Sequence, residues 1–361
     1  MKNNSKKSIF NRFASGIFAV ISIVLALCLT ASIFTHKIDP ELFFWSSFFG
    51  LAFWPLLILN GLMVFLFFFF RSSKIFIPLV ALLIAIPGIR KSAAFQKGET
   101  GSLKIVSYNL HNFHSIYENI TRYEAALKVA ELLKNEEATV VCLQEFNRFG
   151  SNIESDVLLF AEKSNFPYFQ YDVGKRGGGR LILSQHPITL IETWKSLNGR
   201  YLGLLVLVEA EKPFYVASLH LASFQLQKEE LSLFDTETSS TIQRELLGKS
   251  IVRKLGIGFK ERSSEIKYLE SKFPKNSLPI LICGDFNDTP LSFTYGRMTE
   301  NGYQDAFIKK GSGIGTTFSN KLPMLRIDYI WYKNGIEPKH FRTLEFKMSD
   351  HQPVSLEFDL K

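Results

Sequence analysis

The sequence predicts an α/β fold in which two packed sheets are flanked by helices, preceded by a hydrophobic membrane part. Composition changes sharply near residue 95, where runs of Phe, Leu, Ile, Ala and Val give way to ordinary globular polarity. After residue 95, many strand-like apolar runs alternate with helix-spaced patterns, and two packed sheets with outer helices would bury such strands on both faces. Most of the polar motifs close a strand-like run, so we expect one sheet edge to gather them.

The first 95 residues predict a membrane anchor of two or three transmembrane helices, at about residues 13–34, 43–70 and 75–95. The first two uncharged runs contain 22 and 28 residues, and about 20 span a bilayer. A cleaved signal peptide is the alternative for the first run, although apolar signal regions contain only about 7 to 15 residues. The third run, Ile75 to Ile89, is short, and it crosses if Arg90 and Lys91 extend to the interface.

The net charge of +8 belongs almost entirely to the anchor. Residues 1–95 carry nine Lys or Arg against two acidic residues, which is 9 − 2 = +7 and leaves +1 for residues 96–361. Cations before the first run place the amino terminus in the cytoplasm. Three crossings then put residues 96–361 on the outer, periplasmic or extracellular, side, whereas two would leave them in the cytoplasm.

Residues 96–102 are expected to form a short linker, and residues 103–361 a globular domain. Two helical patterns at about residues 239–273, joined by Gly256-Ile257-Gly258, predict a helical hairpin beside the site. Its cation surplus suits anionic headgroups, nucleic acid or a merely solvated face. Strands are expected at residues 103–109, 139–143, near 168, 180–184, 188–194, 201–209, 214–220, 278–283, 326–332, 339–346 and 353–358, with helices at 122–134 and 153–163.

Carboxylates and an amide follow two of the buried strands. Glu145 closes an apolar strand, where an ionised carboxylate is costly unless it is paired or bound to a cation. Metal ligation and a salt-bridged strand end both remain open for it. Asp285 and Asn287 lie on one face of an extended segment, so they can share a water or a phosphate. The alternative there is an Asx turn leading to Pro290.

Histidines and further carboxylates complete the set of candidate site residues. Asp350 and His351 pair an oxygen ligand with an imidazole, whose unperturbed pKa of about 6.5 suits work near neutrality. Asp328 on a buried strand needs a partner, and His351 on an adjacent strand can provide it. His220, alone after an apolar strand, is more typical of a satisfied core residue.

The three cysteines, Cys28, Cys142 and Cys283, have no zinc-binding spacing. Cys142 and Cys283 lie on predicted buried strands just before motif carboxylates, where small thiols fill the core. A disulfide between these two in an oxidising compartment remains the alternative.

In their order along the chain, the motifs resemble the endonuclease/exonuclease/phosphatase superfamily, which has the fold of deoxyribonuclease I. The resemblance implies a four-layer α/β/β/α sandwich and phosphoester hydrolysis assisted by Mg²⁺, for which Mn²⁺ can substitute. It spans about residues 103–360 and rests on Tyr108-Asn109, Gln144-Glu145, Leu219-His220, Gly284-Asp285-Phe286-Asn287, Ile327-Asp328-Tyr329 and Ser349-Asp350-His351.

The resemblance also implies a metal site. Glu145 would hold the ion, with Asn109 and Asp350 close to it. Arg180, at the start of the strand expected at residues 180–184, is a weak candidate for contact with phosphate, and a solvated loop is the alternative.

Catalytic roles follow from the same resemblance. Asp285 would take the proton from the attacking water, and Asn287 would position water or phosphate. His351, oriented by Asp328, would stabilise charge on the pentavalent phosphorus, and His220 would contact a nonbridging oxygen.

The sequence therefore predicts a membrane-tethered, Mg²⁺-dependent phosphoesterase. Its expected partners are the lipid bilayer and a phosphoester substrate, either lipid or nucleic acid, and no protein partner is predicted. One alternative is an extracytoplasmic nuclease acting on DNA or RNA, although a nearly neutral domain lacks the surplus of Lys and Arg that binds a phosphate backbone. Another is a catalytically silent membrane receptor or scaffold that binds a phosphorylated ligand.

Overall fold

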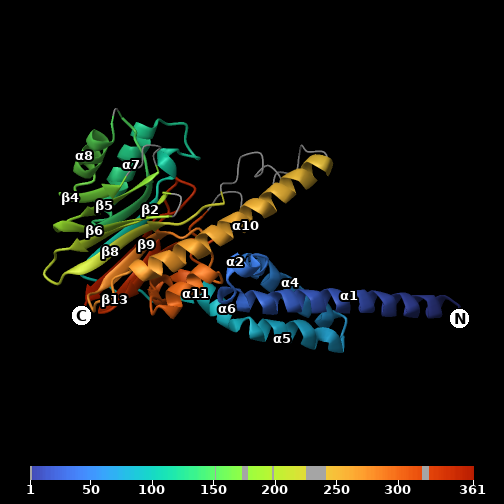
Figure 1. Cartoon of the computed structure of the whole chain (residues 1–361). Helices are drawn as coiled ribbons and strands as arrows, with labels where there is room; N and C mark the ends of the chain where they lie inside the picture. Colours follow the sequence, from blue (N-terminus) through green and yellow to red (C-terminus); the bar gives the residue numbers. More distant parts are fainter. Residues whose placement is uncertain (1, 151, 173–177, 197–198, 225–240, 319–324) are drawn as a thin grey trace.

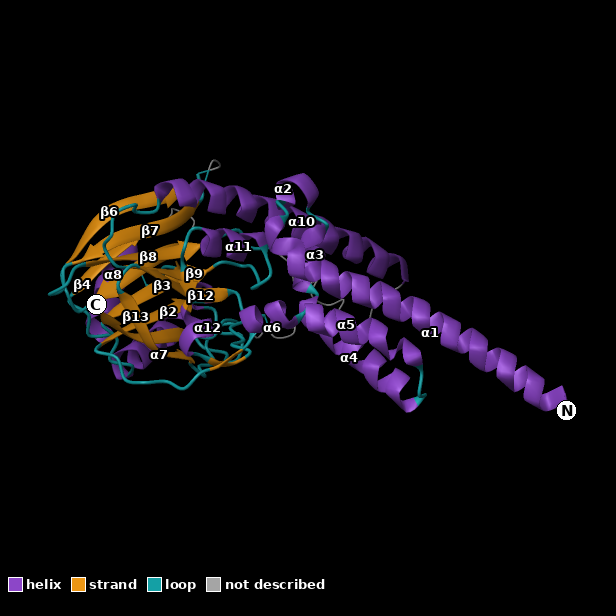
Figure 2. Cartoon of the chain, turned by 90° about the horizontal axis from the view of Figure 1, so that it is seen from below, coloured by secondary structure: helices purple, strands orange, loops and turns teal. Residues whose placement is uncertain are grey.

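The computed structural model describes residues 2–361 except 151, 173–177, 197–198, 225–240 and 319–324. Beyond the anchor, two six-stranded sheets pack face to face with helices on both outer faces (Figure 1). This arrangement confirms the predicted four-layer α/β/β/α sandwich. The anchor helices project from one side of it, as Figure 2 also shows.

The first sheet contains the strands that carry Asn109 and Glu145. Its order is β13 (Ile336–Thr343), β14 (Val354–Leu360), β2 (Leu103–Asn109), β3 (Val140–Phe146), β5 (Gly179–Ser184) and β4 (Tyr168–Asp172). Helix α7 (Arg122–Asn135) starts at a capping box and connects the parallel strands β2 and β3. Together with α8 (Ile153–Lys163), it packs on the outer face of this sheet.

The second sheet contains the strands that carry His220, Asp285 and Asp328. Its order is β10 (Gln304–Asp305), β12 (Asp328–Lys333), β9 (Ile280–Asp285), β8 (Phe214–His220), β7 (Tyr201–Val208) and β6 (Ile188–Lys195). Helices α10 (Thr241–Lys272) and α11 (Phe293–Glu300) cover its outer face, because Ile266 and Met298 join the core on that side.

The space between the sheets is filled by branched apolar side chains such as Ile105, Val216 and Leu281. Cys142 and Cys283 belong to this core, and both thiols are free. Near the site the core becomes polar. There the buried amide of Gln144 donates to the Ser107 and Ser218 hydroxyls at 3.3 and 3.0 Å, which joins the two sheets.

The predicted helical hairpin is wrong, because residues 241–272 form the single helix α10. Gly256 does not end the helix; it allows close packing instead. A Cβ atom there would lie 2.7 Å from the Phe44 ring. The two glycines do not terminate the helix, because they lie where Phe44 and Phe224 pack closely against it.

The anchor begins with α1 (Lys2–Phe34) and a short turn, η1 (Thr35–Lys37). The short helix α2 (Pro40–Phe43) ends where the second hydrophobic run begins. That run is not one helix, because it is divided into α3 (Ser46–Leu51) and α4 (Phe53–Phe69). After the turn η2 (Ser73–Ile75) follow α5 (Phe76–Ile84) and α6 (Ile86–Ser92).

Within the described residues, one helical stretch, Gly16–Lys37, is long and apolar enough to cross a membrane. The pair Ser73–Ile84 and Ile86–Ser92 would be a second one if its 44° bend lies within a single span. Helix α4, with 17 residues, falls just below that length. Three crossings therefore remain a prediction.

The expected linker, residues 96–102, lies along the α/β domain, where the Gln96 and Glu99 backbone N–H groups donate to the Gly311 and Lys339 carbonyls at 2.9 and 3.0 Å. The linker comes directly after strand β1 (Ala94–Phe95). Strand β1 pairs with β11 (Ser312–Gly313), and β11 follows the short helix α12 (Ala306–Lys310) in the chain. The anchor also touches the domain directly. The Thr35 hydroxyl donates to the Leu291 carbonyl at 2.5 Å, and the Arg326 guanidinium donates to the Lys91 carbonyl at 2.8 Å.

Candidate active site

The polar residues gather where four strands end at one edge of the sandwich. Strands β2 and β3 are parallel, as are β8 and β9, so their carboxyl ends lie at the same edge. In register, His220 lies beside Asp285, and Asp328 lies opposite Asp285 on the antiparallel strand β12. The predicted convergence of the motifs therefore occurs.

Gly284 allows the close approach of β8 and β9 that brings His220 next to Asp285. Its φ of 142° belongs to a region that side chains rarely adopt, and a Cβ would lie 2.0 Å from the Leu219 carbonyl oxygen. Only glycine fits at this position.

Asp285 lies at the centre of the site and is almost fully buried. Its Oδ2 accepts hydrogen bonds from the Asn109 and Asn287 amides at 2.9 and 3.1 Å, and its Oδ1 accepts from the Asn287 backbone at 2.8 Å. Burial raises the pKa of Asp285 to about 7, although the nearby charge of His351 opposes the rise.

His351 is held by Asp328. The His351 Nδ1 lies 2.8 Å from the Asp328 carboxylate, and Nε2 lies 3.6 Å from Asp285 Oδ2. Burial alone would lower the pKa of His351, but the charges of Asp328 and Asp285 raise it to about 10. The imidazole is therefore an imidazolium at neutral pH, with Nε2 turned towards the centre of the site.

Glu145 closes β3 at a break in the β3–β5 register. Its Oε2 accepts from Asn112 at 2.6 Å, and its Oε1 lies 3.4 Å from the Asn109 amide. Burial raises the pKa of Glu145, so a carboxylate here needs a cation.

His220 joins the site instead of the core. Its Nε2 lies 3.7 Å from both Glu145 Oε1 and Asp285 Oδ2. Among the described residues this buried nitrogen has no hydrogen-bond partner. Burial, followed by the charges of Arg200 and Arg180, lowers the pKa of His220 well below its ordinary value, which keeps the ring neutral.

Three polar residues of the site have left-handed backbone conformations. Glu145, Asn112 and Asn287 have φ values of 53°, 55° and 51°. Such conformations cost about 1–3 kcal/mol each when the residue is not glycine, and they cluster where a side chain must be held in a functional position. The fold thus accepts local strain to aim these three side chains at one point.

The donor set suits a hard divalent cation. Carboxylate oxygens are ligands that Mg²⁺ prefers, and the Glu145 and Asp285 carboxylates lie 3.4 and 2.9 Å from the same Asn109 amide nitrogen. Two features of the site fit a bound cation or ligand. The buried His220 Nε2 has no hydrogen-bond partner among the described residues, and burial raises the pKa of Glu145, which a bound cation would offset.

Ligand atoms of Asp285, Asp328 and His351 also lie within 4.8 Å of one another. We do not assign the metal to this triad, because Asp328 and His351 already satisfy each other.

A family model described as the endonuclease/exonuclease/phosphatase family matches residues 106–351. The chain belongs to this family. A second model, described as a domain of unknown function, matches residues 15–92. The comparison with curated proteins finds no match.

Solved structures agree on the fold. A family protein from Leptotrichia buccalis superposes with a TM-score of 0.50 at 15% identity, over 71% of this chain and 99% of that one. Another, from Beutenbergia cavernae, superposes with a TM-score of 0.51 at 15% identity, over 72% of this chain and 71% of that one. At this identity the likeness establishes the architecture alone.

Asp350 reaches the same edge of this family fold. Its Oδ1 lies 3.9 Å from His111 Nδ1 and accepts from the Ser349 hydroxyl at 3.3 Å. Asp350 therefore borders the Glu145 side of the site through the loop that carries His111 and Asn112.

Arg180 is buried and paired with other groups of the protein. The side chain is buried, its Nε donates to Asp172 at 3.0 Å and its Nη1 donates to the Tyr201 carbonyl at 2.7 Å. The weak prediction of substrate binding is wrong, because the cation is already used to join β4, β5 and β7.

His111 and Asn112 are site neighbours that the motif reading missed. They belong to the short turn η3 (His111–Phe113) directly after β2. Their signal was present, because polar residues that immediately follow a buried strand lie at the same edge as the strand's last residue. Asn112 matters most, since it holds Glu145 and in turn accepts from Asn147 at 3.2 Å.

Proposed function

We propose that this chain is a membrane-anchored phosphoesterase that hydrolyses a phosphodiester or phosphomonoester with the help of Mg²⁺. The observation that carries this proposal is the position of Asp285. Its carboxylate, with a pKa of about 7, lies 3.6 Å from His351 Nε2 and 3.7 Å from His220 Nε2, and the Asn109 amide links it to Glu145. Membership in the family supports phosphoester hydrolysis as the reaction class.

Asp285 is suited to act as the general base. A base works best when its pKa lies near the operating pH, and burial brings the Asp285 pKa to that range. Two amides and one backbone N–H fix the carboxylate, so its remaining lone pair has a defined direction. It can accept the proton from a water that attacks phosphorus.

His351 and His220 are suited to bind phosphate oxygens as negative charge develops. The protonated His351 uses Nδ1 for Asp328 and keeps Nε2 for a nonbridging oxygen. His220 is neutral, and its unpartnered Nε2 can donate in the matching tautomer. Donors fixed in a water-poor site stabilise such charge more strongly than water does.

Glu145 would hold Mg²⁺, with Asn109 and Asp350 close by, and Mn²⁺ would fit the same oxygen donors. When bound, the ion would neutralise charge on the phosphate oxygens and favour the ionised carboxylates. Asn112 would keep the Glu145 carboxylate aimed at that position through its 2.6 Å hydrogen bond.

The surface of the anchor supports attachment to a membrane. Large apolar side chains point outward, with 65% of Leu27 and 69% of Phe65 exposed. Meanwhile Leu29, Phe53 and Ala85 form a core between the same helices. Soluble proteins rarely leave contiguous apolar surface of this kind uncovered, whereas a lipid bilayer would cover it.

We infer a lipid phosphoester as the substrate class. The nearly neutral catalytic domain lacks the cation surplus of a nucleic-acid enzyme, and an anchored active site meets lipids continuously.

The full-length protein in liposomes should be tested on phospholipid and on linear DNA, with Mg²⁺ or with a chelator. Asp285→Ala serves as the inactive control. We expect Mg²⁺-dependent release of a phosphorylated headgroup or of phosphate. Cleavage of DNA while the lipids stay intact would instead favour the nuclease. Hydrolysis of neither substrate would reject a lipid phosphoester as the substrate.

A further inference from the structure

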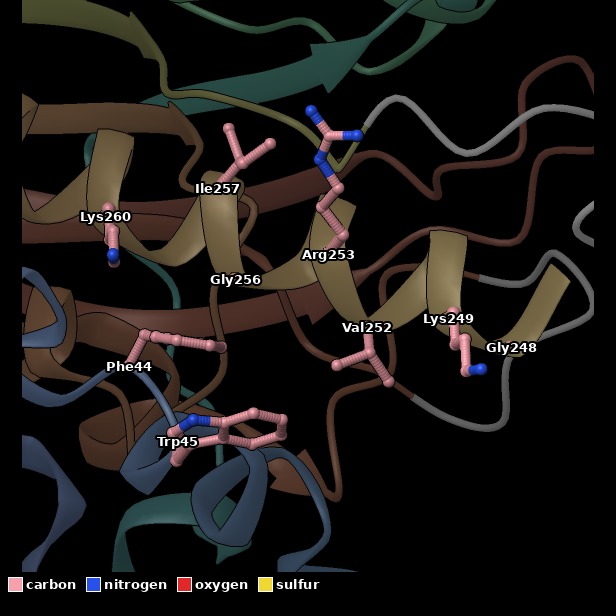
Figure 3. Close-up of a pocket in the computed structure, with 9 residues that line it drawn as sticks. All are labelled: Phe44, Trp45, Gly248, Lys249, Val252, Arg253, Gly256, Ile257 and Lys260. Atoms are coloured by element: carbon pink, nitrogen blue, oxygen red, sulfur yellow. The ribbon is translucent and has the colours of Figure 1, made fainter. Parts of the chain in front are cut away.

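A groove of about 540 Å³ lies between α10 and the turn that joins α2 to α3, and none of the candidate active-site residues lines it (Figure 3). Phe44 and Trp45 form one wall, and Val252 faces them from the helix. Gly248 and Gly256 leave the helix surface bare at this place. The groove is therefore an apolar slot of the size that small ligands occupy.

Two lysines border this apolar slot. Lys249 and Lys260 extend from the side of α10 that faces the slot, whereas Arg253 points away from it (Figure 3). Lys260 lies 5.0 Å from the centre of the Phe44 ring. None of the nine described residues that line the groove carries a carboxylate, and the acidic partner of Lys249 is Glu245, which pairs with it at 2.7 Å one helical turn away. An apolar slot with a basic rim complements a molecule that has an acyl chain and an anionic head.

The groove lies next to the membrane end of the molecule. Trp45 follows the candidate span Gly16–Lys37 by only a few residues and is 50% exposed, and tryptophan is typical of the bilayer interface. Leu246 and Ile257 on α10 are 63% and 46% exposed. An exposed helix that combines such apolar residues with lysines and arginines is typical of segments that lie at a membrane surface.

The anchor holds α10 in place beside the groove. Asp39 accepts from the Ser263 hydroxyl at 2.6 Å and pairs with Lys267 at 2.8 Å, and Glu41 also pairs with Lys267. Phe48 and Phe259 pack edge to face with ring centres 5.4 Å apart. The two walls of the groove are thus fixed relative to each other, so the slot is preformed.

We propose that this groove binds a phospholipid with an anionic headgroup, taken from the bilayer that surrounds the anchor. One acyl chain lies between Trp45 and Val252, and the headgroup meets Lys249 and Lys260. The inference rests on the membrane attachment in the proposed function, but it is independent of the reaction at Asp285.

The test uses the full-length Asp285→Ala protein in detergent, so that turnover cannot remove the lipid. Phosphatidylglycerol and phosphatidylcholine with identical acyl chains are titrated, and bound lipid is counted by native mass spectrometry. Two groove variants are compared, Val252→Trp, which fills the slot, and Lys249→Gln with Lys260→Gln. The matched control is Lys134→Gln with Lys163→Gln, which removes two exposed lysines far from the groove.

We expect phosphatidylglycerol to bind about tenfold more tightly than phosphatidylcholine, because each lysine near an anionic headgroup adds favourable interaction. The double lysine variant should lose most of this preference, and Val252→Trp should weaken both lipids about tenfold. The control should bind like the parent. Equal binding of the two lipids, or groove variants that match the control, would overturn the proposal.

A lipid-independent dimer that Val252→Trp abolishes would assign the groove to a second copy of the chain and would also overturn it. The lysine variant guards against misfolding, because both substituted side chains are exposed. Failure of lipid binding would leave hydrolysis at Asp285 standing, and failure of hydrolysis would leave lipid binding standing.

Discussion

At the scale of single residues, Asp328 keeps the His351 imidazole of the candidate active site positively charged. The Asp328 carboxylate lies 2.8 Å from His351 Nδ1 and is the strongest of the charges that raise the His351 pKa to about 10. As a positioning residue, Asp328 acts through His351 and does not itself touch the phosphate.

Asp328→Asn should lower kcat about 10- to 100-fold, as expected for loss of a residue that orients a functional group. It should also move the alkaline limb of the pH–rate profile to lower pH. The sign follows because burial favours the neutral imidazole, so without the Asp328 charge His351 loses its proton earlier.

The measurement is kcat against pH for the two proteins at saturating Mg²⁺. Glu162→Gln, an exposed carboxylate on α8, is the control and should leave the profile unchanged. An alkaline limb that stays in place in Asp328→Asn would refute the assigned role.

The single residues that strand-end motifs predicted do lie at the site. A carboxylate or amide at the end of a buried strand must face the sheet edge, because the apolar core would leave it without a partner. Arg180 was misjudged because a sequence does not show which cation finds a buried partner, in this case Asp172. The place of Asn112 after a buried strand predicts that it lies at this edge, but its hydrogen bond to Glu145 depends on a left-handed turn that the sequence pattern does not specify.

Strands β8 and β9 illustrate the element scale, because their closeness decides whether His220 meets Asp285. Gly284 is the point of contact between them. The strands themselves could be predicted from their apolar runs, but the need for glycine at this position appears only when the two backbones are seen together.

Gly284→Ala should destabilise the protein by about 3 kcal/mol, through its strained φ and the overlap with the Leu219 carbonyl. Thermal unfolding of the full chain measures the effect. Gly248→Ala provides the comparison, because its Cβ would meet nothing within 4 Å. There we expect stabilisation of up to about 1 kcal/mol from helix propensity. Equal unfolding temperatures for the two variants would contradict this account of the β8–β9 contact.

Helix α10 could be predicted as helical, but its continuity could not. Glycine is a helix terminator when solvent surrounds it, and a packing residue when another segment approaches. Phe44, more than 200 residues earlier in the chain, supplies that approach at Gly256. Another long-range contact joins the second hydrophobic run to α10, where Phe48 on α3 packs against Phe259 with ring centres 5.4 Å apart.

At the scale of the whole molecule, the amino-terminal helices and the α/β domain pack against each other. Asp39 binds α10, Thr35 binds the loop after Asn287 through Leu291, and Arg326 reaches the Lys91 carbonyl. Composition alone could separate the two parts of the chain near residue 95. It could not show that they are packed together.

The predicted topology places the catalytic domain outside the cytoplasm. Lys163→Cys, on the exposed face of α8, should react with a membrane-impermeant maleimide in intact cells. Ser5→Cys should react only after permeabilisation, because the cations at the amino terminus keep it inside. Native Cys142 and Cys283 are fully buried and should stay silent. Protection of Lys163→Cys in intact cells would place the domain in the cytoplasm.

The central claim is that the gathered motif residues form one working phosphoesterase centre, and hydrolysis of bis(p-nitrophenyl) phosphate tests it most directly. The full-length protein in detergent is measured with Mg²⁺ and with a chelator, beside Asp285→Asn. We predict Mg²⁺-dependent turnover that falls about a thousandfold in Asp285→Asn, as expected when a general base is lost, with unfolding temperatures that match. Turnover that survives both the chelator and Asp285→Asn would contradict the account.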